Sequence, residues 1–169
     1  MIKNQNILRS INQLTIFKLG NHSNQKVDRL RLNVRYNSRQ YLSWIQEYGD
    51  AQDFADLVNV GYGKVICISF STAGGINEEK DEEILNELFH IFNFLRALHE
   101  RRNWQPSFQP LPLLARRTEE QIEEEGANEE IEAQMSNYRK VQGYYSDVKQ
   151  QANKAKAEIL NHFIHRRRI

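Results

Sequence analysis

Glu87 and His90 are the residues whose types and spacing come closest to a chemical site, because they form a Glu-x-x-His pair with Glu83 one helical turn earlier. Carboxylate-bridged di-metal sites in helical bundles need two such pairs and two further glutamates. The sequence has one pair, and Glu158 with His162, spaced i, i+4, does not complete the set. We interpret these side chains as polar residues beside an apolar stripe, and we expect no metal and no other cofactor.

The single cysteine is the second candidate for chemistry. Cys67 lies between Ile66 and Ile68, without the basic neighbour or helix N-terminus that activates a thiol. The segment 69–77 connects it to a helix, as phosphate loops do, but matches neither GxGxxG nor GxxxxGK[ST]. We therefore predict a buried Cys67 and no catalytic residues. A small enzyme is the third hypothesis, and it would need a pocket that gathers Cys67, Ser69, Ser71, Thr72 or His90.

Arginines are the candidates for phosphate contacts. They lie in two groups: Arg29, Arg31 and Arg35 near the start of the chain, and Arg166, Arg167 and Arg168 at its end. They support an alternative hypothesis, a nucleic-acid or ribosome-associated protein. The formal net charge of only +1, from 23 Lys and Arg against 22 Asp and Glu, weakens it. Tyr36 also alternates with the arginines, whereas RNA-binding sheets stack bases on aromatic residues of the binding face.

The sequence predicts two β-strands. The stretch 29–36 alternates strictly between apolar and polar residues, which indicates a half-buried strand, and 65–70 is a short apolar run rich in β-branched residues. Helices are predicted over 38–49, 50–58 and 77–102, with Asn77 as the N-cap of the last. The fold class is therefore α+β, a small β-α-β-α module with an N-terminal amphipathic helix and a long C-terminal helical arm.

The 169 residues divide by composition into four segments. They are an N-terminal amphipathic segment at 1–26, an α+β core module at 27–104, a Pro-rich connector at 105–117 and a charged helical arm at 118–169. The first segment has no acidic residue, as is typical of mitochondrial targeting peptides, although the favoured interpretation is a helix that packs on the domain or on a partner. The arm has apolar residues at an average spacing of 3.5, the coiled-coil period.

The single cysteine and the lack of a long apolar run indicate an intracellular, reducing compartment, with a mitochondrial one still open, and no transmembrane span.

These features favour a non-catalytic accessory or structural subunit of a larger protein assembly. Two strands are too few for an independent sheet, and the apolar faces at both ends of the chain need a cover. We expect other protein subunits to supply it. The predicted partner-binding residues are Ile7, Leu8, Ile11, Leu14, Met135, Tyr138, Tyr145, Val148 and Ile159.

Overall fold

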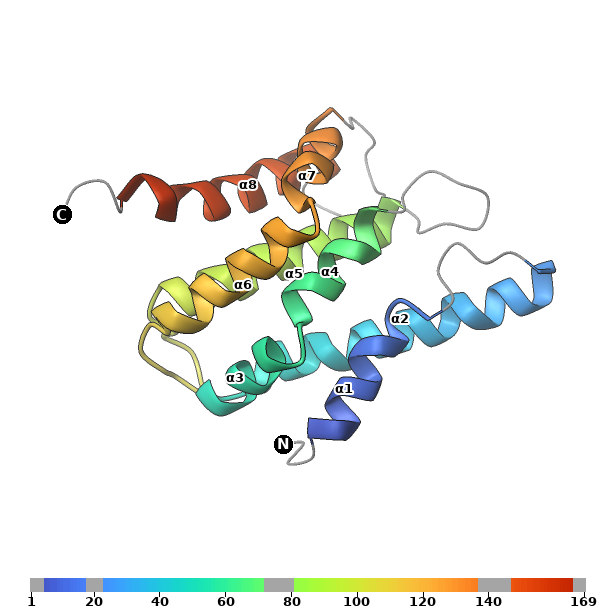
Figure 1. The fold of residues 1–169 in the computed structure, drawn as a ribbon, viewed down its shortest axis with the longest axis horizontal. Coiled ribbons are helices and arrows are strands. Elements are labelled where there is room, and N and C mark those ends of the chain that lie inside the picture. Colours follow the sequence, from blue (N-terminus) through green and yellow to red (C-terminus); the bar gives the residue numbers. More distant parts are fainter. Residues whose placement is uncertain (1–4, 18–22, 72–80, 137–146, 166–169) are drawn as a thin grey trace.

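A computed structural model describes residues 5–17, 23–71, 81–136 and 147–165, and these residues form eight α-helices (Figure 1). The helices are α1 (Gln5–Leu14), α2 (Gln25–Tyr48), α3 (Ala51–Asn59), α4 (Tyr62–Ser71), α5 (Asp81–His99), α6 (Pro112–Glu124), α7 (Ala127–Met135) and α8 (Val148–His165).

The α+β prediction is wrong, because the described part of the chain is all-α and contains no strand and no sheet. Its β-like feature is one isolated antiparallel bridge between Arg102 and Phe108. The β-α-β-α module over 27–104 therefore does not exist. Helices replace both of its predicted strands.

The predicted strand at 29–36 is the N-terminal part of α2. Asn24 caps this helix by accepting a hydrogen bond at 3.0 Å from the backbone N–H of Val27. Leu30 is exposed and Arg35 is buried, so the alternation in the sequence does not separate an inner face from an outer one. The pattern misled because several polar residues of this helix face inward.

The predicted strand at 65–70 lies within α4. Val65, Ile66 and Cys67 are all buried, and they project from the helix in different directions. A helix that is apolar on all sides is a buried helix, and its short apolar run resembles that of a buried strand in the sequence.

The predicted helices at α3 and α5 are confirmed. Asp50 caps α3 with a capping box that also involves Asp53, so α3 begins where the helix over 50–58 was predicted to begin. The long helix α5 is present, although Asn77 lies outside the described residues. Pro112 opens α6 at one of its first helical positions instead of belonging to the connector. Gly126, at φ 67°, makes the turn between α6 and α7.

One hydrophobic core joins the four segments, because its buried residues run from Leu8 on α1 to Ile159 on α8. Helix α5 packs against α4, α6 and α8, while α7 packs against α8. The C-terminal arm therefore folds back on the rest of the chain. Helix α2 packs against α1 and α3 and lies along one edge of the molecule (Figure 1).

Candidate functional site

The predicted partner-binding residues lie mainly inside the molecule. Leu8, Val148 and Ile159 are at most 2% exposed, and Ile11 and Met135 pack against the core. Two others, Ile7 and Leu14, are 51% and 38% exposed. Tyr138 and Tyr145 lie outside the described residues. The chain thus covers most of the apolar surface that was expected to need another subunit.

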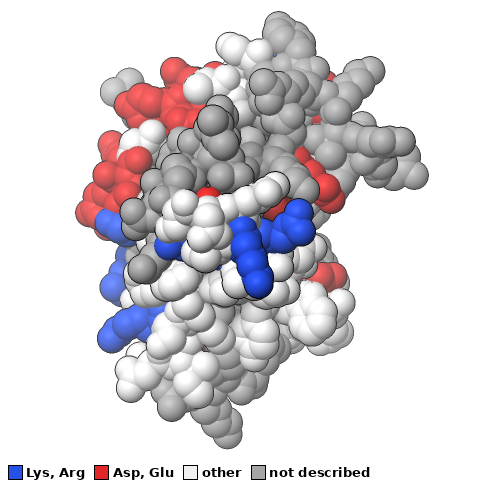
Figure 2. All heavy atoms as spheres, turned by 90° about the vertical axis from the view of Figure 1, so that its right-hand side faces the viewer, with Lys and Arg blue, Asp and Glu red and all other residues white. Residues whose placement is uncertain are grey.

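The predicted phosphate contacts do not share a face. Arg29 is exposed, Arg31 pairs with Asp28 at 3.3 Å, and Arg35 is buried and donates a hydrogen bond to the Phe17 carbonyl at 3.4 Å. Residues 166–168 lie outside the described part of the chain. On the face seen in Figure 2, Lys and Arg side chains form a small group with Asp and Glu side chains above and beside it. The arginines of α2 therefore do not form an extended basic surface.

The other chemical candidates that the structure describes are Cys67, Glu87 and His90. Cys67 is buried in the core, and burial raises the pKa of its thiol well above the usual value. Glu87 forms a buried ion pair with Arg39, while burial lowers the pKa of His90 to about 4. Thr72 and the side chains of residues 69 and 71 lie outside what the structure describes. Among the described residues no group of three or more His, Cys, Asp or Glu could hold a metal ion.

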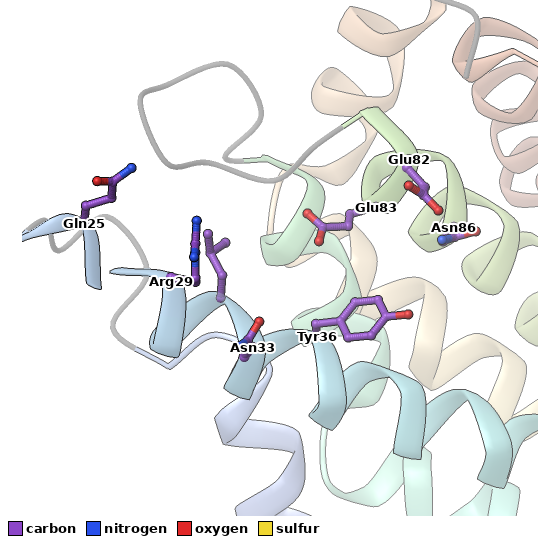
Figure 3. Close-up of a pocket in the computed structure, with 8 residues that line it drawn as sticks. Gln25, Arg29, Asn33, Tyr36, Glu82, Glu83 and Asn86 are labelled. Carbon is purple, nitrogen blue, oxygen red and sulfur yellow. The ribbon is translucent and has the colours of Figure 1, made fainter. Parts of the chain in front are cut away.

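A cleft of about 540 Å³ lies between α2 and the start of α5 (Figure 3). Arg29 and Tyr36 line it from α2, and Glu82, Glu83 and Asn86 line it from α5. Tyr36 points from α2 toward α5, as Figure 3 shows. Two carboxylates facing one guanidinium make phosphate binding in this cleft unfavourable. The two carboxylates also come from consecutive residues of one helix. The cleft therefore resembles a polar helix–helix groove more than a reaction site.

A second polar cluster ties the C-terminal arm to the core. His99 Nε2 on α5 lies 2.9 Å from Glu119 Oε1 on α6, and both side chains are nearly buried. Glu158 on α8 interacts electrostatically with both, and burial raises the pKa of its carboxyl. The His99–Glu119 contact therefore connects the start of the arm to α5, with Glu158 of α8 nearby.

The inner face of α2 is unusually polar. Arg39 pairs with Glu87 of α5 at 3.1 Å, with both side chains 6% exposed. Gln46 donates a hydrogen bond to the carbonyl of His90 at 3.1 Å and accepts one from the Tyr62 hydroxyl at 3.0 Å. Asp28, Arg35, Ser38 and Ser43 are also buried on this helix. The inner face is therefore held by specific polar contacts, and these fix its orientation toward the core.

The outer face of α2 carries the large apolar side chains. Leu30 is 58% exposed, Tyr41 44%, Trp44 63% and Tyr48 60%. With the half-buried Val34 and the exposed Asn37, they follow one line along the helix at spacings of 4, 3, 4, 3 and 4. We name this line the α2 seam, and its residues are Leu30, Val34, Asn37, Tyr41, Trp44 and Tyr48.

The sequence contains the signal for the α2 seam, but the predicted strand over 29–36 hides it. Within the helix predicted over 38–49, Tyr41, Leu42, Ile45 and Tyr48 resemble one apolar stripe in the sequence, but they belong to two faces. In the structure Leu42 and Ile45 point into the core while both tyrosines point out. A continuous helix over 25–48 reveals the spacing immediately.

No helix in the part of the chain that the structure describes is long and apolar enough to cross a membrane. No protein-family model, no curated protein and no solved structure matches this chain.

Proposed function

We propose that this chain is a non-catalytic structural subunit of a protein assembly and that it docks to another protein chain through the α2 seam. The observation that carries the proposal is the reversed polarity of α2. Its buried face contains Arg39 and Gln46, whereas Trp44 and Tyr48 lie exposed on the opposite face. A surface helix of a lone globular protein normally has the opposite arrangement.

The size of the exposed apolar surface supports docking. An aromatic side chain carries about 150–250 Å² of surface, so Tyr41, Trp44 and Tyr48 leave roughly 350 Å² open at their exposed fractions. With Leu30 and Val34 the α2 seam offers roughly 500 Å². Contiguous apolar patches of this size on soluble proteins often mark an interaction site.

The composition of the α2 seam favours a protein partner over a nucleic acid. Tyr and Trp are enriched at the centres of protein interfaces, where charged residues are depleted. The α2 seam has no charged residue, and Arg29 lines the cleft instead. The proposed docking face therefore moves from the terminal helices, which pack in the core, to α2.

Site-specific photo-crosslinking in native extract tests this function. Tyr48 is replaced by the photoreactive residue benzoylphenylalanine in one variant, and Leu113 on α6 in a matched control. Leu113 is 83% exposed and belongs to α6 instead of the α2 seam. We expect a discrete protein adduct at position 48, formed with any protein chain, and none at position 113.

The outcome separates the hypotheses. An adduct with nucleic acid at position 48 contradicts the proposal and supports the nucleic-acid alternative. Equal, diffuse labelling at positions 48 and 113 also contradicts it, because the α2 seam would then be an ordinary exposed surface.

A further inference from the structure

We infer that the chain that covers the α2 seam is a second copy of this protein, lying antiparallel across it. This inference rests on the proposed function and names the occupant of the proposed docking face. It follows from the spacing, the order of side-chain sizes and the charge distribution along α2.

The spacing of the α2 seam is that of a coiled coil. Steps of 4, 3, 4, 3 and 4 place Leu30, Asn37 and Trp44 at d positions, and Val34, Tyr41 and Tyr48 at a positions. Helix α2 has 24 residues, so it extends for about 36 Å. This length presents three full heptad repeats to a partner helix.

The order of side-chain sizes favours an antiparallel pair. The N-terminal half of the α2 seam is small and its C-terminal half is aromatic. When two copies run in opposite directions, Leu30 faces Tyr48 of the second copy and Val34 faces Trp44. Asn37 faces Tyr41, so the amide can meet the phenol hydroxyl. Every layer then combines one small and one large side chain, and the distance between the helices is even.

In a parallel pair each residue of the α2 seam would face the same residue of the second copy. Trp44 would face Trp44 and push the helices apart, while Val34 would face Val34 and leave a gap. Two-fold symmetry with antiparallel helices avoids both problems and makes the interface self-complementary.

The charges of α2 point the same way. Lys26 and Arg29 are exposed near the start of the helix, whereas Arg31 pairs with Asp28 and Arg35 is buried. The C-terminal end carries the exposed Glu47 and is followed by the exposed Asp50. An antiparallel pair sets the exposed basic residues of one copy beside the acidic end of the other and also opposes the two helix dipoles.

The area fits a reversible dimer. Covering roughly 500 Å² on each copy buries roughly 1,000 Å² in total, which is at the lower limit for a specific interface. We therefore expect self-association in the micromolar range instead of an obligate dimer.

Two measurements on the purified full chain test the inference. Sedimentation velocity is expected to show a dimer at roughly 100 µM chain and mainly monomer at about 1 µM. Trp44→Gln and Tyr48→Gln should each weaken dimerisation by about tenfold or more, whereas Leu113→Gln should leave it unchanged. Circular dichroism confirms that each variant folds.

The direction of the helices is read from spin labels on Lys26→Cys, since Cys67 is buried and stays unlabelled. In the antiparallel dimer the two label sites lie about 39 Å apart along the axis, whereas a parallel dimer brings them within about 10–20 Å. A short distance overturns the inference, as does a chain that stays monomeric at roughly 100 µM.

These results are distinguishable from failure of the proposed function. If the purified chain stays monomeric but position 48 crosslinks to a different protein in extract, the docking function is supported and the inference of self-association is contradicted. The purified chain could instead form the antiparallel dimer while position 48 forms no protein adduct in extract. That result would support the inferred geometry and contradict the docking function.

Discussion

Arg39 Nε lies 3.1 Å from Glu87 Oε1, and each of these side chains is only 6% exposed. This ion pair joins α2 to α5 on the face of α2 that points into the molecule. Together with the hydrogen bonds of Gln46, it determines that the aromatic residues of α2 point outward.

Removing one partner of this pair should destabilise the protein strongly. We expect Glu87→Leu to lower the free energy of unfolding by about 3–5 kcal/mol, because Arg39 would remain buried without its counter-charge. The double variant Arg39→Met with Glu87→Leu should recover most of that loss. Urea denaturation of the wild type, both single variants and the double variant measures the coupling. A loss below about 1 kcal/mol for Glu87→Leu would show that the pair is solvated.

Arg102 should be essential for the end of α2. Its guanidinium is buried, donates to the Gly49 carbonyl at 2.8 Å and to the Glu47 carbonyl, and lies 5.1–5.7 Å from the ring centroids of Phe54, Trp104 and Phe108. We expect Arg102→Leu to cost about 2–4 kcal/mol in thermal or urea denaturation, since it leaves carbonyls unpaired.

The neighbouring Arg101 is exposed and provides the control for that variant. Arg101→Leu should change stability by less than about 0.5 kcal/mol. Similar losses in both variants would argue against a specific role of Arg102.

Helix α1 should be an integral part of the fold. Leu8 is 2% exposed, and the Asn12 amide donates a hydrogen bond to the Val60 carbonyl at 2.8 Å. We expect Leu8→Ala to cost about 2–4 kcal/mol, whereas Ile7→Ala, at a 51% exposed site, should cost less than about 1 kcal/mol. An unchanged stability for Leu8→Ala would instead suit a removable leader that does not pack on the domain.

Stability should fall in mild acid because of His90. Burial lowers the pKa of His90 to about 4 in the folded state, against 6.5 for the free side chain. Between these values the unfolded chain binds a proton that the folded chain does not, so the free energy of unfolding should fall by about 2–3 kcal/mol as pH drops from 6.5 to 4.

The comparison of wild type with His90→Asn isolates this effect. Glu158 has the opposite sign, because burial raises its pKa and its protonation favours the folded state. Its contribution is common to both proteins and cancels. Urea denaturation at several pH values should show a shallower pH dependence for the variant, and identical slopes would contradict the assignment.

The sequence was most informative where the physics is local. The helices predicted over 50–58 and 77–102 depend on interactions between neighbouring residues, and the structure contains α3 and α5 at these places.

The sequence failed where tertiary contacts reverse the usual pattern. Arg39 and Gln46 face inward because Glu87, Tyr62 and the His90 carbonyl provide partners from distant positions. No rule of spacing anticipates those partners. The apolar run of α4 shows no helical period because the consecutive residues Val65, Ile66 and Cys67 are all buried.

Trp44 allows a direct test of the claim that another chain covers the outer face of α2, because its side chain is 63% exposed. We predict that hydroxyl radicals oxidise Trp44 several-fold more slowly in the native assembly than in the purified chain at about 1 µM, whichever protein covers it. Equal oxidation of Trp44 in the two samples would contradict the account.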